Sequence, residues 1–120
     1  MLPPDAPGYR SPSETFDAHV LNAALDLEER WGPRWGRVEF GTETVPPSGG
    51  TPWENGVPLG RLFPADAGQP ARVVLYRRPL EQRAEKADLG PLVRDVLVEN
   101  IAHLLGRRAE DVDPHYGSGM

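Results

Sequence analysis

Cysteine is absent from the 120-residue chain, so the protein can form neither a disulfide framework nor a metal site with thiolate ligands. No apolar run reaches the roughly 18 to 20 residues that a membrane-spanning helix needs. The first residues lack the basic and apolar segments of a signal peptide. Acidic residues outnumber basic ones, 18 to 13, so the formal net charge is -5, and Lys86 is the only lysine. We therefore expect a cytoplasmic protein that binds neither a membrane nor nucleic acid.

What is abundant is proline and glycine, with 14 and 13 residues, which predicts many turns. The length fits one domain with a single modest core. We expect that domain to span residues 1–120. Within it, we expect a flexible lead-in at 1–10 and a flexible tail at 114–120.

The first predicted helix begins after Ser11. Ser11 and Glu14 match a capping box, and Pro12 suits the first helical turn because proline has no amide to leave unpaired. Apolar residues then recur at helical spacing for several turns. We expect this helix to end at Gly32-Pro33.

Three strands are predicted after this helix. Residues 37–42 alternate with period two and predict a half-buried strand. Residues 59–63 are bracketed by prolines, which favours an edge strand. Residues 71–77 are apolar on both faces, which favours the centre of a sheet. The connections are predicted to be a long loop at 45–57 and a turn at 65–70.

A second long helix is predicted over residues 88–106. Pro91 suits its first turn and Gly106 its C-terminal end. Residues 80–86 contain good helix formers and predict two further helical turns before it. The order helix, strand, strand, strand, helix predicts a small α/β or α+β layer.

Three ionisable residues interrupt the apolar face of the second helix. Asp95, Glu99 and His103 are each four residues apart, so they share one stripe of the helix surface. This stripe is the first place to look for chemistry. His19, on the first helix, is better explained as a surface or packing histidine than as a metal ligand.

Two segments of the chain resemble a known family. The first is Leu-Tyr-Arg-Arg-Pro-Leu at 75–80, and the second is Val-Leu-Val-Glu-Asn-Ile-Ala-His-Leu-Leu-Gly at 96–106. Both look like the short bacterial zincin-like metallopeptidases, also called minimal zincins. Asn-Gly-Val-Pro-Leu-Gly at 55–60 is similar to the segment before that family's edge strand. The resemblance spans roughly residues 14–113 and is closest over 71–106.

The resemblance implies an α+β zincin-like fold. Its parts would be a long N-terminal helix, a short mixed sheet of three to four strands, and a C-terminal motif helix. The family motif is His-Glu-x-x-His followed by x-x-Gly. Its two histidines bind zinc from one helical face, and the glutamate activates a zinc-bound water. An acid three residues after the glycine supplies a third ligand.

The motif departs from this pattern in three places. His103 and Gly106 match the second histidine and the glycine. Glu99 stands in place of the first histidine, Asn100 in place of the general base, and Ala109 in place of the downstream acid. A neutral amide cannot take a proton from water, so Asn100 removes the expected base.

Two interpretations of the stripe remain. One is a ladder of hydrogen bonds between acids and histidine along the helix. The other is a metal site, with zinc possible, formed by Glu99, His103 and one residue further along the chain. We favour the ladder, and we favour a solvated end over a ligand cluster at 111–115. The candidates for the third ligand are Glu110, Asp111, Asp113 and His115.

We therefore expect no catalytic residue and a family member that acts as a binding or structural module. A peptide or protein partner could add as a strand at Leu59, Arg61 and Phe63. We expect a monomer or a weak homodimer. The alternative is an active metal-dependent peptidase that uses Glu99, His103 and a downstream acid.

Overall fold

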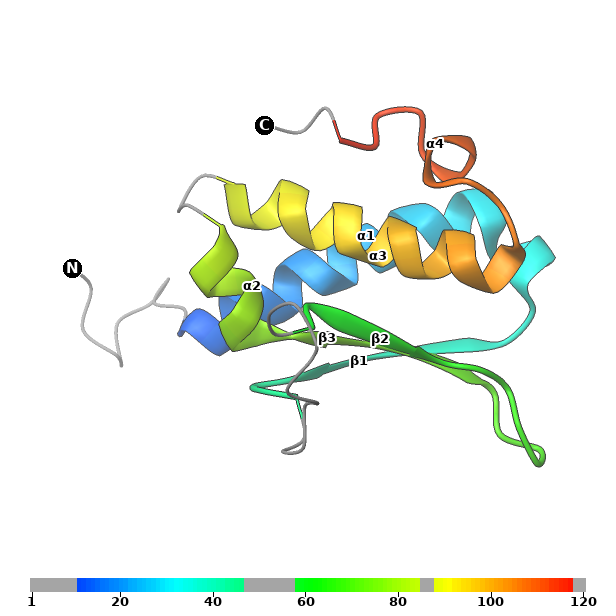
Figure 1. Ribbon diagram of the computed structural model, residues 1–120, viewed down its shortest axis with the longest axis horizontal. Coiled ribbons are helices and arrows are strands. Elements are labelled where there is room, and N and C mark those ends of the chain that lie inside the picture. Colours follow the sequence, from blue (N-terminus) through cyan, green and yellow to red (C-terminus); the bar gives the residue numbers. More distant parts are fainter. Residues whose placement is uncertain (1–10, 47–57, 85–87, 118–120) are drawn as a thin grey trace.

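The computed structural model describes residues 11–46, 58–84 and 88–117. In these residues, the helices lie on one face of a three-stranded sheet (Figure 1). The predicted α+β layer is therefore confirmed. The expectations for the lead-in at 1–10 and for most of the 45–57 loop lie outside the described residues.

Helix α1, Pro12–Trp35, begins as predicted but runs further than expected. Ser11 Oγ accepts a hydrogen bond from the Glu14 N–H at 3.2 Å, and the Glu14 carboxylate accepts one from the Ser11 N–H at 3.2 Å. The predicted end at Gly32-Pro33 is wrong. Pro33 lies within the last turn, where its missing N–H costs one helical hydrogen bond. The helix ends instead at Gly36, which has φ +70°.

The sheet has the strand order β1-β3-β2. Strand β1, Val38–Glu43, is parallel to β3, Ala71–Tyr76, whereas β2, Gly60–Phe63, is antiparallel to it. Strand β3 is buried on both faces except at Arg72. Its central position and the edge position of β2 are both confirmed. The predicted turn at 65–70 joins β2 to β3.

In the described residues, three further helices follow the sheet. Helix α2, Arg77–Arg83, begins earlier than predicted because Pro79 fits its first turn. Helix α3, Leu89–Leu105, ends at Gly106 in the left-handed conformation, as predicted. Helix α4, Ala109–Val112, is a single turn that was not predicted. Helices α1 and α3 pack together above the sheet (Figure 1), and most of the core lies between them and β3.

Gly60 allows β2 to approach α3 closely. A Cβ at this position would lie 2.7 Å from Leu75 Cδ2, 3.1 Å from Val74 O and 3.1 Å from Val96 Cγ1. Replacing Gly60 by alanine is therefore expected to lower the free energy of unfolding by about 1–3 kcal/mol, as measured by urea denaturation. The control is Gly41→Ala, where the added Cβ meets only the end of a flexible arginine side chain. Equal stability losses in the two variants would contradict close packing at Gly60.

Candidate functional site

The segment that follows α4 contacts two residues of the stripe on α3. The Tyr116 hydroxyl donates a hydrogen bond to Glu99 Oε2, and the Gly117 N–H donates one to Asp95 Oδ1 at 3.3 Å. Among the described residues, no hydrogen bond joins Asp95, Glu99 and His103 to one another. The predicted ladder is therefore not formed, and the two carboxylates instead bind the end of the chain.

The contact with Glu99 changes the pKa of the Tyr116 hydroxyl. The hydrogen bond to Glu99, together with burial and nearby negative charge, raises the pKa of the Tyr116 hydroxyl to about 12. The reason is that ionisation would place a phenolate directly against a carboxylate. At neutral pH the hydroxyl is therefore a firm donor to Glu99.

Glu99→Gln is expected to bring the pKa of Tyr116 back towards about 10, because it removes the charge that opposes ionisation. The pKa is raised in the folded state, so the contact contributes its full stability below about pH 10 and loses it as pH rises through about 12. Ultraviolet titration of the tyrosines measures this, and Tyr116→Phe identifies the signal. Asp95→Asn should cause a smaller shift, since Asp95 acts on Tyr116 only through its charge. An unchanged pKa in Glu99→Gln would contradict the contact.

Asn100 points back along its own helix. Its Nδ2 donates to Val96 O at 2.8 Å, and the side chain is half-buried. Asn100, which the resemblance aligns with the general base of the family motif, is thus a neutral amide with one of its N–H groups bonded to its own helix. His103, three residues on, is exposed.

Asp113 binds Arg94 and is the one buried charged residue among those that the structure describes. Arg94 Nε donates to Asp113 Oδ2 at 2.8 Å, and Arg94 Nη2 donates to Asp26 Oδ2 at 2.6 Å, so this arginine joins α3 to both α1 and the C-terminal segment. Although burial acts to raise it, the pKa of Asp113 is held below its usual value by hydrogen bonds from Arg94 and from the His115 N–H. The expected solvated end at 111–115 is therefore wrong for Asp113.

The remaining candidate ligands lie on or beside α4. Trp31 Nε1 donates to Val112 O at 2.9 Å, which fixes the helix against the end of α1. Glu110 and Asp111 are exposed, and Glu110 pairs with Arg108 at 3.4 Å. Within the described part of the chain, no three histidine, aspartate or glutamate side chains are grouped so that they could hold a metal ion. The donors in this arrangement do not fit a zinc site.

His19 has a packing role. It lies against the first turn of α3, where a Cβ on Gly90 would be 3.1 Å from His19 Nδ1. This agrees with the interpretation that His19 is a packing residue.

A sequence model of zincin-like metallopeptidases matches residues 42–118, which is well over half of the chain. The chain belongs to the zincin-like metallopeptidase family. The predicted family is thereby confirmed, and the match covers the sheet from the end of β1, the motif helix α3 and the segment after it. Helix α1 precedes the matched region. No curated protein matches this zincin-like chain.

Two residues of the site were not identified from the sequence. Arg94 had one available signal, since it is a charged residue within the apolar helix. Tyr116 had none, because it meets Glu99 only after the chain turns back at α4. In the described residues, no helix is long and apolar enough to cross a bilayer.

Proposed function

We propose that this zincin-like protein does not hydrolyse peptides and acts as a binding module. The observation that carries the proposal is Asn100, whose amide stands at the general-base position and donates to Val96 O. An amide nitrogen cannot accept a proton from water. Losing a general base typically costs on the order of 10² to 10⁴ in rate.

The replacement of the first zinc ligand supports the same proposal. Glu99 could bind a metal through oxygen, but its carboxylate accepts the Tyr116 hydroxyl. A metal at this position would first have to displace the tyrosine. The residue at the downstream acid position, Ala109, packs partly against the core and has no donor atom in its side chain.

The edge strand β2 is the surface that we propose binds a peptide. Strand β2 is at the edge of the sheet in the described residues, so its outer side can accept an added strand. Arg61 and Phe63 are exposed on it, with the Arg61 guanidinium carbon 6.0 Å from the centre of the Phe63 ring. Leu59 begins this edge and packs partly on the core.

Cleavage assays on unstructured peptides test the loss of activity. With zinc added, the protein is expected to cleave no faster than a buffer control. Peptide binding at β2 is tested separately with Phe63→Ser, which removes the exposed ring without disturbing the core. Zinc-dependent cleavage that a chelator abolishes would refute the proposal.

The alternative is a metal-dependent peptidase with rearranged ligands. It is favoured by the exposure of Glu99 and His103 on one stripe of α3 and by the exposed acids Glu110 and Asp111 further along the chain. It predicts that zinc displaces Tyr116 and that His103→Ala abolishes zinc uptake, measured by calorimetry at neutral pH. If the wild-type protein takes up no zinc, this alternative fails.

A further inference from the structure

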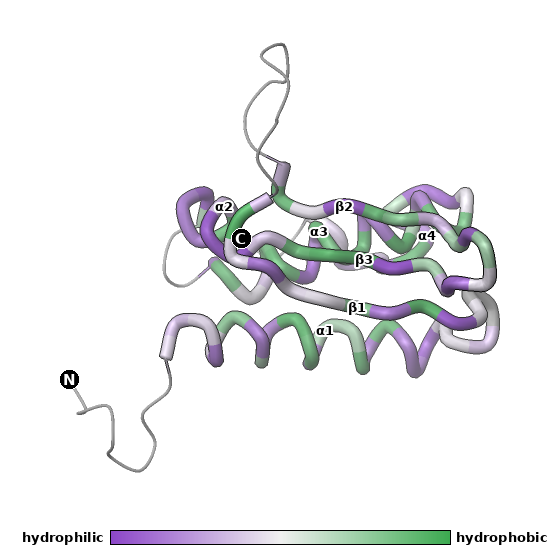
Figure 2. The backbone as a smooth tube through the Cα atoms, turned by 90° about the horizontal axis from the view of Figure 1, so that it is seen from below, coloured by the Kyte–Doolittle hydropathy of each residue, from purple (hydrophilic) through white to green (hydrophobic). Residues whose placement is uncertain are grey.

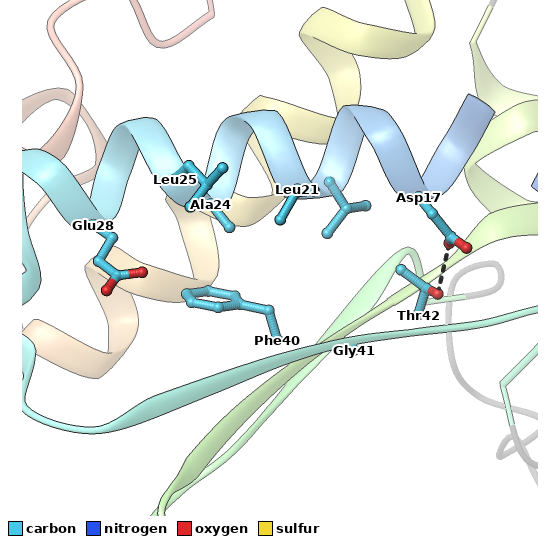
Figure 3. A pocket seen from close by; sticks show the side chains of 9 residues that line it. Asp17, Leu21, Ala24, Leu25, Glu28, Phe40, Gly41 and Thr42 are labelled. Atoms are coloured by element: carbon cyan, nitrogen blue, oxygen red, sulfur yellow. Dashed lines mark hydrogen bonds between the residues drawn. The ribbon is translucent and has the colours of Figure 1, made fainter. Parts of the chain in front are cut away.

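A groove lies between α1 and β1, along the edge of the sheet that β1 forms. Strand β2 forms the other edge. Helix α1 lies above the sheet in Figure 1 and projects past β1 in Figure 2. It therefore covers the space beside the β1 edge like a roof. The space beneath this roof measures about 420 Å³. Leu21 and Leu25 of α1 line it and are 57% and 55% exposed, while the Phe40 side chain points towards them from β1 (Figure 3).

The hydrogen-bonding pattern shows which main-chain groups of β1 face this groove. The Tyr76 N–H donates to Leu59 O at 3.0 Å, so even-numbered residues of β3 turn their main-chain groups towards β2. Leu75 therefore turns its main-chain N–H and C=O groups towards β1, where its partner in the register is Thr42. In a parallel ladder a residue bonds to the two neighbours of its partner, so Thr42 itself faces away from β3. By the same alternation, Val38 also turns its N–H and C=O groups away from β3, towards the open edge of β1.

The charges around the groove are mainly acidic. Asp17 and Glu28 line it, and no basic residue does so in the part of the chain that the structure describes. Glu39 and Glu43 are exposed on the opposite face of β1, and Arg72 pairs with Glu39 in the register. A strand added beside β1 would therefore meet apolar side chains flanked by Asp17 and Glu28 on the face towards α1 (Figure 3), and glutamates on the other face. Its best side chains would be apolar towards α1 and basic on the opposite face.

We propose that this groove binds an extended peptide of alternating apolar and basic residues, which adds to the edge of β1 beneath α1. The main-chain groups of Val38 and Thr42 would bind the peptide backbone, as in other cases of strand addition. Leu21 and Leu25 would lose their exposure to water, which supplies an apolar driving force. This surface is distinct from the β2 edge and from the stripe on α3.

A second copy of the chain fits this groove poorly. Helix α1 projects past β1 (Figure 2). If two β1 strands paired symmetrically, the two α1 helices would therefore compete for the same space above the new pair of strands. A single peptide strand has no such helix to accommodate. The geometry therefore favours a peptide over self-association at this edge.

Amide hydrogen exchange on the full chain tests the proposal, with a blocked peptide that alternates lysine and valine as the probe. In the free protein, the Thr42 amide is expected to exchange rapidly, whereas those of Gly41 and Glu43, which face β3, are protected. Saturating peptide should slow exchange at Thr42 by about tenfold or more and leave the other two unchanged. A matched peptide with glutamate in place of lysine should not bind.

Variants on the two edges locate the binding site. The double variant Leu21→Ser with Leu25→Ser changes exposed positions only, and it should weaken peptide binding by about tenfold or more. Phe63→Ser, on the opposite edge, should leave the protection of the Thr42 amide by this peptide unchanged. Loss of binding in Phe63→Ser alone would overturn this inference and place the peptide on β2. No binding at all, or protection of Thr42 in the free protein by the chain itself or by a second copy, would also overturn it.

Discussion

Replacing Arg94 by methionine is expected to lower the free energy of unfolding by about 2–3 kcal/mol, because it leaves the Asp113 carboxylate buried without its cation. The side chain of Asp113 is only 2% exposed, whereas that of Arg94 is 28% exposed. Water near Arg94 screens the ion pair, so the expected loss of stability is smaller than for a fully buried pair. Methionine keeps an unbranched apolar stem that packs as the arginine stem does. Urea denaturation at neutral pH measures the difference.

Two further variants separate the charge from the packing. Arg108→Met removes an exposed pair with Glu110 and is expected to cost at most about 0.5 kcal/mol. Adding Asp113→Asn to Arg94→Met should recover part of the loss, since the unpaired buried charge is gone. If Arg94→Met and Arg108→Met were equally stable, the bridge from α1 through α3 to the C-terminal segment would have no role in stability.

The pH dependence follows from the direction of the Asp113 shift. Its pKa is lower in the folded than in the unfolded state, so its contribution is present above about pH 4, the usual aspartate value. That contribution is lost as pH falls through the lower folded-state pKa. The stability difference between wild type and Arg94→Met should therefore shrink in strong acid.

Restoring the family motif is expected to produce the largest functional change. Glu99→His with Ala109→Asp adds the missing histidine and the downstream acid to His103, which gives the three protein ligands of a catalytic zinc site. Histidine at position 99 also removes the carboxylate that holds Tyr116. This double variant should retain zinc through gel filtration where the wild type does not.

The general base can then be tested by itself. Adding Asn100→Glu to the zinc-binding double variant should raise the rate of peptide cleavage by about 10² to 10⁴. The double variant with Asn100 is the matched control, because it differs only at the base. If none of these variants binds zinc better than the wild type, the stripe on α3 is not the zinc-binding face of this protein.

The sequence predicted the features that local interactions determine. The capping box at Ser11 predicted the start of α1, and Gly106 predicted the end of α3. The prolines on either side of β2 predicted that this strand lies at an edge of the sheet. The stripe of Asp95, Glu99 and His103 also followed from helical spacing alone. Such features depend on neighbouring residues, so a single sequence is enough to identify them.

The contacts that define the site join residues far apart in the chain. Arg94 reaches Asp26 and Asp113, and Tyr116 reaches Glu99 across the turn at α4. No spacing rule connects these partners, because their distance depends on how α1, α3 and the C-terminal segment pack. The same reason explains the wrong expectation that the segment containing Asp113 would be solvated.

The metal content of the wild-type protein shows whether this zincin-like chain binds zinc. The protein would be purified without a metal column, incubated with zinc, passed through gel filtration and subjected to elemental analysis. With Glu99 bound to Tyr116 and no fitting group of donors in the described residues, we expect well below one zinc ion per chain and no cleavage of unstructured peptides. Close to one zinc ion per chain, together with peptide cleavage that a chelator abolishes, would contradict the account.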